Sequence, residues 1–273
     1  MNSRLRTMVE CSMLIALATV LSLLKLVDLP YGGSVTCASM LPIVIIAYRH
    51  GIRWGLVSGL VYGVIQQLLG LHTLTYVTTW QSVLAVILLD YVFAFPVMGL
   101  GGVFRRVCPR QSTALFCGTL LGCFLRYLMH VISGATVWAG LSIPTTAVLY
   151  GSLSYNATYM LPETIILAAV ALYLGSVLDF RPELPVRMAH DTADRAVIVC
   201  QTLSGLSALV GTVVATVTLF PTLQDPDTGN FDITRLTGEA LTVPGIALGV
   251  GLFLCGALLL AAVLRDKKTA PRA

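Results

Sequence analysis

The hydrophobic positions of this chain are gathered into eight long apolar runs, which short polar connections separate. The runs span approximately residues 8–27, 37–48, 53–71, 80–104, 112–138, 154–178, 196–220 and 242–264. A helix needs about 20 predominantly apolar residues to cross the hydrocarbon core of a bilayer. The pattern therefore predicts an all-α fold, a polytopic membrane helix bundle in which each run forms one helix.

The polar connections divide the predicted bundle into two unequal parts. A hydrophilic linker at about 181–195 separates the first six runs from the last two. We therefore expect a six-helix membrane domain at 1–180 and two additional transmembrane helices at 196–273. The last two runs are apolar and glycine-rich, and the connection between them, Gln224 to Thr242, is acidic and expected to be extracellular. The polar residues of the first six helices are thus the candidates for function.

The beginning of the chain has two features of its own. The first run follows Arg4 and Arg6 as in a signal peptide, but no clear small-residue cleavage site follows it, so we interpret it as a spanning helix. The second run is short, and we expect the connection from Asp28 to Thr36 to be an irregular loop that dips toward the bilayer. Such a backbone is tolerated at that depth only beside protein or a water-filled cavity.

Composition and charge agree with a membrane protein. Hydrophobic residues make up 56% of the chain and charged residues 11%, whereas soluble domains carry roughly 25% charged residues. The net charge of +4 does not indicate nucleic-acid binding, because most basic residues lie in short connections between apolar runs. Connections with several basic residues alternate along the chain with connections that carry few. The positive-inside rule therefore predicts a multi-pass protein of the cell membrane, surrounded by membrane lipid, with both termini in the cytoplasm.

Two charged residues are predicted to lie deep in the membrane. Asp90 in the fourth run and Arg126 in the fifth are each roughly 15 Å below the outer end of their helix. A charge at the centre of a spanning helix costs about 2.5–3.5 kcal/mol, so such residues pair with one another or mark a site. One interpretation is an Asp90–Arg126 ion pair that only joins two helices. The other is that Asp90 meets a cationic ligand while Arg126 forms the floor of a pocket.

The fifth run carries a polar face. Arg126, His130 and Gly134 recur every four residues, so they share one side of a helix, and Trp138 follows above them. Gly134 would allow a flat ligand or a neighbouring backbone to approach closely. We predict that this face lines a pocket open to the outside, because polar groups in a membrane usually face a cavity.

The sixth run carries a second polar face, on which Asn156, Tyr159 and Glu163 follow helical spacing. Trp138 and Tyr155 fall near the outer interface of the membrane. Tryptophan and tyrosine form belts there in most membrane proteins, so a pocket position and a belt position are equal alternatives for these two residues.

This set of residues suits the binding of a flat, positively charged heteroaromatic molecule. Its ring can be stacked on aromatic side chains, and its charge can be met by the deep carboxylate and by cation–π contact. The sequence contains no nucleophile–base arrangement, no phosphate loop and no metal motif, and the seven cysteines form no CxxC pair. We therefore expect no enzyme activity, no cofactor and no metal.

At these residues the sequence resembles the thiamine-specific S-components (ThiT/YuaJ-like) of energy-coupling-factor vitamin transporters. The resemblance covers about residues 8–180 and rests on several stretches together. They are Leu-Pro-Tyr-Gly-Gly-Ser-Val-Thr at 29–36, Gly-Ile-Arg-Trp-Gly at 51–55, Leu-Leu-Asp-Tyr at 88–91, Arg-Tyr-Leu-Met-His-Val-Ile-Ser-Gly at 126–134 and Tyr-Asn-Ala-Thr-Tyr-Met-Leu-Pro at 155–162.

The resemblance implies a six-helix, vitamin-binding subunit without enzyme activity. Such a subunit is loaded from outside and docks on a transmembrane coupling protein that two cytoplasmic ATPases drive. Small residues of the first helix, Ser12 and Ala16 here, are the expected docking positions. The expected ligand contacts are Asp90, Tyr91, His130, Gly134, Trp138, Tyr150, Ser152, Tyr155 and Asn156, and the candidate pocket floor is Arg126 and Glu163.

The chain departs from the family pattern at three points. The acidic residue is typically a glutamate, one methylene longer than Asp90. A tyrosine expected five residues before Asn156 falls on Gly151, with Tyr150 beside it. The family core ends near residue 180, so the resemblance says nothing about the last two helices.

Two other functions remain as alternatives. The chain could be a stand-alone vitamin carrier in which the last two helices replace the coupling partner, although it lacks the repeat symmetry common in secondary carriers. It could also be a membrane enzyme or sensor for a thiamine-like molecule, against which the absence of a catalytic arrangement argues. The sequence is equally compatible with thiamine, its pyrimidine fragment and a phosphorylated form.

Overall fold

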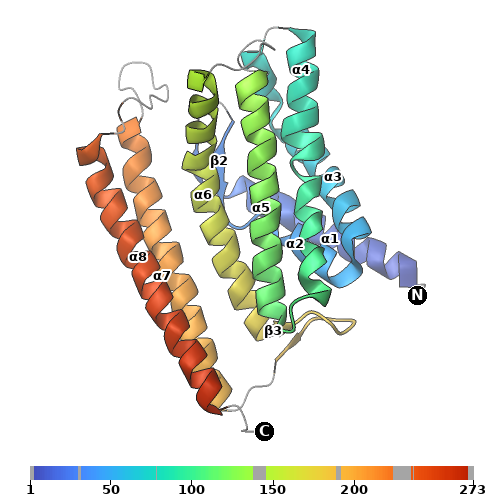
Figure 1. Ribbon diagram of the computed structural model, residues 1–273. Helices are drawn as coiled ribbons and strands as arrows, with labels where there is room; N and C mark the ends of the chain where they lie inside the picture. The colour runs from blue at the N-terminus through green and yellow to red at the C-terminus, as the bar shows by residue number, and fades with distance from the viewer. Residues whose placement is uncertain are drawn as a thin grey trace.

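The computed structural model describes residues 3–29, 32–77, 79–137, 146–188, 192–223, 235 and 237–269. Its long helices are α1 (Ser3–Leu23), α3 (Ile52–Leu69), α5 (Gln111–Thr136), α6 (Thr146–Val177), α7 (Thr192–Leu223) and α8 (Gly238–Thr269). The shorter ones are α2 (Leu41–His50), η1 (Leu71–Tyr76), α4 (Trp80–Val86), η2 (Ile87–Phe93) and η3 (Pro96–Arg106). Each predicted apolar run coincides with one helical passage, the fourth being α4, η2 and η3 together. The predicted all-α membrane bundle is therefore confirmed (Figure 1).

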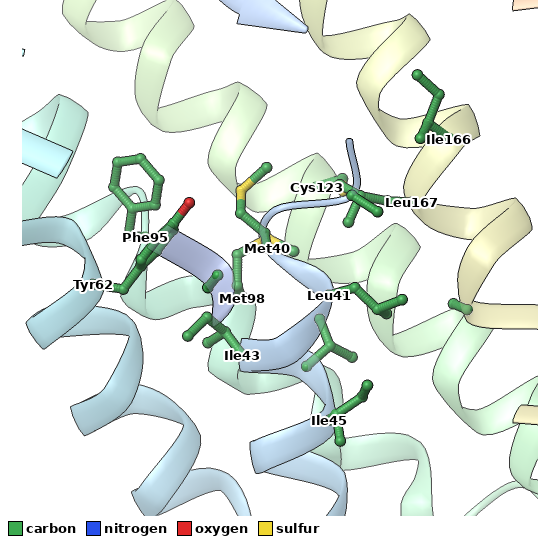
Figure 2. Packing of buried hydrophobic residues seen from close by; sticks show 14 of the residues in the cluster. Met40, Leu41, Ile43, Ile45, Tyr62, Phe95, Met98, Cys123, Ile166 and Leu167 are labelled. Carbon is green, nitrogen blue, oxygen red and sulfur yellow. The ribbon is translucent and has the colours of Figure 1, made fainter. Parts of the chain in front are cut away.

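The short second run forms a helix in the centre of the bundle. Every residue of α2 from Leu41 to Tyr48 is buried. Figure 2 shows its side chains between Tyr62 and Phe95 on one side and Ile166 and Leu167 on the other. Because α2 packs against protein on all sides, its apolar run needs only ten residues.

Glycines on one face of α3 bring the fourth passage into close contact. Gly55, Gly59 and Gly63 recur every four residues, the spacing of closely packed membrane helices. A Cβ atom on Gly59 would lie 2.7 Å from the Cα of Pro96, and one on Gly63 would lie 2.5 Å from the carbonyl oxygen of Tyr91. Larger residues on this face would therefore displace the segment that carries Asp90 and Tyr91.

The fourth passage is not the single regular helix that the apolar run at 80–104 predicts. Regular α4 gives way to the π-helical η2 at Ile87 and then to the 3-10 helix η3 at Pro96. One residue inserted into an α-helix rotates the side chains that follow by about 100°. Such π segments occur frequently at functional sites, and Asp90 and Tyr91 both lie within η2.

The connection before α2 also differs from the prediction. Instead of an irregular loop, Lys25–Asp28 (β1) and Ser34–Thr36 (β2) form an antiparallel β1–β2 hairpin. Val27 pairs with Val35, and the amide of Leu29 donates to the carbonyl of Gly33 at 2.7 Å. The expected irregular loop was wrong, because the two segments satisfy their backbone groups by pairing with each other.

The last two passages form an α7–α8 hairpin, in which α7 lies against α6 and α8 lies beside α7 (Figure 1). The two helices approach closely where Gly211 meets Gly251, since a Cβ on either glycine would lie 2.8 Å from the Cα of the other. The linker predicted at 181–195 is partly structured: Leu178–Asp179 (β3) pairs with Val186–Arg187 (β4), and α7 begins at Thr192. Most of the predicted acidic connection, 224–242, lies outside the described residues, and α8 begins at Gly238.

Basic connections meet at one end of the bundle, which we call the arginine-rich end. Arg49, at the end of α2, forms an ion pair with Glu10 of α1 and donates to the carbonyl of Phe180 at 2.6 Å, beyond α6. Arg105 of η3 donates to the carbonyl of Arg49 at 2.9 Å. Because α6 runs from Thr146 to Val177, its first turns lie at the opposite end of the bundle.

Candidate functional site

A cavity of about 440 Å³ lies between the β1–β2 hairpin and helices α3, η2, α5 and α6. This volume is within the range of small-molecule sites, about 300–1,000 Å³. Its exposed lining residues include Lys25, Asp28, Gly32, His72 and Gly151, which mark the mouth.

The floor of the cavity lies deep in the bundle. Arg126 is 9% exposed and Glu163 is 2% exposed, and both line the cavity. At about 1.5 Å per residue, the twelve residues of α6 from Gly151 to Glu163 place the floor about 18 Å below the mouth. The cavity thus reaches toward the middle of the bundle from the end opposite the arginine-rich end.

Most of the candidate ligand contacts meet in this cavity. Its lining includes Asp90, Tyr91, His130, Gly134, Ser152, Tyr155 and Asn156, together with Arg126 and Glu163. Tyr150 is 65% exposed and is not part of the lining, to which its neighbour Gly151 contributes. Trp138 lies outside the described residues. The structure therefore brings together residues from η2, α5 and α6 but does not bring Tyr150 to them.

Asp90 is held by two side chains of α5. His130 Nδ1 lies 2.8 Å from Asp90 Oδ1, and Ser133 Oγ donates to Asp90 Oδ2 at 2.7 Å. The carboxylate accepts both bonds, so Nδ1 carries a proton. The other ring nitrogen, His130 Nε2, is buried and has no hydrogen-bond partner among the described residues. The His130 side chain itself contributes to the cavity lining.

Arg126 pairs with Glu163, so the interpretation of an Asp90–Arg126 ion pair is wrong. Arg126 Nη1 donates to Glu163 Oε2 at 2.8 Å, and the guanidinium lies over the ring of Phe95, 5.1 Å from its centroid. The second carboxylate oxygen of Glu163 accepts from Thr36 Oγ1 at 2.7 Å. The floor therefore connects α5, α6 and the β1–β2 hairpin, while Asp90 of η2 bonds to His130 instead.

Asn156 fixes the contact between α5 and α6. Its Nδ2 donates to the carbonyl of Ser152 at 2.9 Å and lies 3.3 Å from the carbonyl of His130, while its Oδ1 accepts from Tyr159 at 2.7 Å. Gly134 faces this contact, since a Cβ there would collide with Ser152 Oγ. The amide of Asn156 therefore positions His130 and Tyr159 around the cavity, in addition to lining it.

One carboxylate that lines the cavity, that of Asp90, has no arginine or lysine partner among the described residues. Of the charged side chains that line its described part, Arg126 pairs with Glu163 and Lys25 pairs with Asp28 at 2.9 Å. Asp90 is bonded to Ser133 and to His130 instead. The cavity thus combines this carboxylate with the aromatic side chains of Tyr91, Phe95, Tyr155 and Tyr159.

Sequence reasoning missed several residues of the site. Ser133 follows His130 by three residues, so helical spacing on its own could have placed it beside that histidine. Thr36 and Gly33 sit in a short segment whose strand pairing has no strong local signal. Phe95 lies in an apolar run, and the apolar pattern of that run does not indicate the π segment that precedes Phe95.

Helix α1 carries two pairs of small residues at a spacing of four, and the two pairs lie on different faces. Ser12 and Ala16 are exposed, whereas Ala18 and Ser22 are buried. Ser22 accepts a hydrogen bond from Gln66 of α3 at 2.8 Å. The pair Ala18 and Ser22 therefore packs inside the bundle, and the pair Ser12 and Ala16 is accessible on its surface.

The fold and the cavity define a polytopic membrane protein with a ligand-sized site between its helices. Comparison with known proteins agrees with this class. The model of the thiamine transporter protein family (Thia_YuaJ) matches residues 8–179. The chain is 33% identical over 184 residues to the thiamine transporter ThiT of Bacillus subtilis (strain 168), which covers 63% of this chain and 92% of that relative. It is 26% identical over 168 residues to the thiamine transporter ThiT of Lacticaseibacillus paracasei, covering 58% and 76% respectively.

The chain therefore belongs to the thiamine transporter protein family. It is a transport protein and not an enzyme. The matched residues end in β3, so the family model includes α1 to α6 and leaves out the α7–α8 hairpin.

Proposed function

We propose that the chain is a substrate-binding membrane subunit, which captures thiamine or a close analogue from outside and delivers it to the cytoplasm with an ATP-driven energy-coupling-factor module. The observation that carries this proposal is the carboxylate of Asp90, which lines the cavity without an arginine or lysine partner among the described residues, beside several aromatic side chains. Thiamine is a flat monocation with an aminopyrimidine ring. Its charge complements Asp90, and its ring nitrogens and amine complement the polar side chains of His130 and Asn156.

The direction of loading follows from the charges at the two ends of the bundle. Arg49, Arg105 and Arg181 lie at or beside the arginine-rich end, which the positive-inside rule assigns to the cytoplasm. The cavity mouth lies at the other end and then faces outside. Both termini are cytoplasmic in this orientation, and the ligand enters between the β1–β2 hairpin and the first turns of α6.

Delivery by a coupling module gives the exposed small residues of α1 a role. Ser12 and Ala16 would allow a helix of a transmembrane coupling protein to approach closely. Two cytoplasmic ATPases would drive that protein. We divide the chain accordingly into a vitamin-binding domain at 1–180, a cytoplasmic linker at 181–195 and two further helices at 196–273.

A stand-alone carrier is the second candidate, because the α7–α8 hairpin packs on α6 where a partner could otherwise bind. Purified chain reconstituted in vesicles, without ATPase subunits, separates the two candidates. The coupling-module proposal predicts binding of thiamine without accumulation inside the vesicles. Accumulation by the chain alone would support the carrier.

Calorimetric titration of the purified chain with thiamine tests the site. We expect Asp90→Asn to weaken binding at least about tenfold, or 1.4 kcal/mol, because the amide removes the negative charge of the carboxylate. Asp28→Asn is the matched control, since it makes the same chemical change at the exposed mouth, where Asp28 already pairs with Lys25. It should change affinity by less than about threefold, as for a surface ion pair.

The same titration with riboflavin and biotin checks specificity. Equal affinity for these vitamins would contradict a thiamine site. Unchanged thiamine affinity in Asp90→Asn would contradict the role of the carboxylate, even if thiamine binds.

A further inference from the structure

The α7–α8 hairpin lies beyond the matched residues, and its contact with the β1–β2 hairpin gives it a role at the cavity. The β1–β2 hairpin forms one wall of the cavity, to which Lys25, Asp28, Ser34 and Thr36 contribute. A ligand that enters or leaves by the mouth passes this wall. The position of the hairpin therefore governs access to the site.

On its inner face the β1–β2 hairpin lies directly on the other cavity walls. A Cβ atom on Gly33 would lie 2.7 Å from the ring of Tyr159, and one on Gly32 would lie 2.6 Å from the methyl group of Thr73. Thr36 donates to Glu163 on the floor. These contacts are close, but each covers a small area, since two of them involve glycines, which have no side chain.

The outer face of the hairpin is apolar. Side chains alternate between the two faces of a strand, and Ser34 and Thr36 line the cavity, so Val35 between them faces away from it. Val35 is fully buried and pairs with Val27 of β1. Val27 packs against the same apolar cluster to which Val35 and Phe220 of α7 belong.

The buried side chains of α7 change in size along its length. Most of them are small, at Ser204, Ala208, Thr212, Ala215 and Thr216. In the last turns the buried residues become large: Phe220 is 5% exposed and Leu223 is fully buried. Small residues allow close helix packing. Helix α7 also contacts β1, and Phe220 belongs to the same apolar cluster as Val35.

We propose that Phe220 and Leu223 are positioning residues that hold the β1–β2 hairpin against the cavity, so that the α7–α8 hairpin slows exchange of the bound ligand. The proposal rests on the proposed function for the identity of that ligand, thiamine. The structural part, that α7 stabilises β1 and β2, holds for any ligand. Without α7, β2 would keep its contacts with α1 and α6, but β1 would lose its contact with α7, which favours local opening of the hairpin.

Hydrogen exchange of the full-length, ligand-free chain in nanodiscs tests the structural part. We expect Phe220→Ala and Leu223→Ala to speed exchange at the amides of β1 and β2 by at least about tenfold and to leave α5 unchanged. Phe253→Ala and Leu206→Ala are matched controls. They delete the same side chains where Phe253 is 75% exposed and Leu206 is 51% exposed, so β1 and β2 should keep their protection.

The kinetics of thiamine binding test the functional part. We expect dissociation at least about tenfold faster in Phe220→Ala, with association changed by less than about threefold, because the loosened hairpin releases the ligand sooner. Phe220→Leu should retain most of the slow dissociation, since it keeps an apolar side chain of similar length.

The possible results separate this proposal from the proposed function. Unchanged exchange at β1 and β2 in both alanine variants would overturn it. Equal loss of protection in β1, β2 and α5 would also overturn it, because it would show a general role in stability. Faster exchange confined to β1 and β2, in a chain that binds no thiamine, would support the role of α7 in holding the β1–β2 hairpin. It would refute only the proposed function.

Discussion

The cavity-bearing region, α1 to η3 with α5 and α6, and the α7–α8 hairpin are both apolar helix assemblies, but different bonds hold them. In the first region, polar side chains join different helices, as between Arg126 and Glu163 or between His130 and Asp90. In the α7–α8 hairpin, the hydroxyls of Ser207 and Thr212 donate to carbonyls three or four residues earlier in the same helix.

The difference reflects what each region has to do. Close packing of small residues suffices to associate two helices in lipid, as Gly211 and Gly251 illustrate. A ligand site also needs side chains fixed in direction, and hydrogen bonds between helices supply that direction. Polar residues within a membrane bundle are therefore informative about function when they bond across helices, and uninformative when they bond within one.

The largest effect should come from breaking the buried pair on the cavity floor. We expect Glu163→Gln to lower the free energy of unfolding by about 3–5 kcal/mol, because the Arg126 guanidinium loses its carboxylate while remaining buried. Unfolding in mixed micelles measures this loss. The double variant Glu163→Gln, Arg126→Met should recover most of it, and a double variant as unstable as the single one would contradict the explanation.

An intermediate effect is expected where the polar bonds orient the site. Asn156→Ala should weaken thiamine binding about tenfold, or 1.4 kcal/mol, because Tyr159 and the contact with α5 lose their common partner. Thr158→Val is the control, since its hydroxyl donates to the carbonyl of Tyr155 on the same helix. Equal affinity losses in both variants, measured by calorimetric titration, would remove the distinction between the two kinds of bond.

The smallest effect is expected in the α7–α8 hairpin. Thr212 is buried, and its hydroxyl donates to the carbonyl of Ala208, which lies one turn earlier in α7. We expect Thr212→Val to change the free energy of unfolding by less than about 1 kcal/mol, because the helix already satisfies that carbonyl. A loss comparable with that of Glu163→Gln in the same unfolding assay would contradict the comparison.

Much of the site could be predicted from helical spacing alone. The recurrence of Arg126, His130 and Gly134 placed three cavity residues on one face of α5, and the spacing of Asn156 and Glu163 did the same on α6. These predictions needed only the rotation of about 100° per residue within one regular helix.

The partners of these residues could not be predicted in the same way. Spacing left Asp90 with a choice between Arg126 and a ligand, whereas the structure pairs it with His130 and Ser133. That choice depends on the π segment and on the glycine face of α3 that meets it. Neither feature changes the apolar pattern of the fourth run, so the pattern could not reveal them.

The sequence by itself determined the membrane class, the eight helical passages and the side of each helix that carries polar groups. These follow from the composition and from the period of a single helix, which are local properties. Only the tertiary structure decided which polar groups bond to one another, where the β1–β2 hairpin lies and what α7 contacts. Those features depend on how helices distant in sequence rotate and approach one another. Hydrogen bonds of about 3 Å form only in a narrow range of such arrangements.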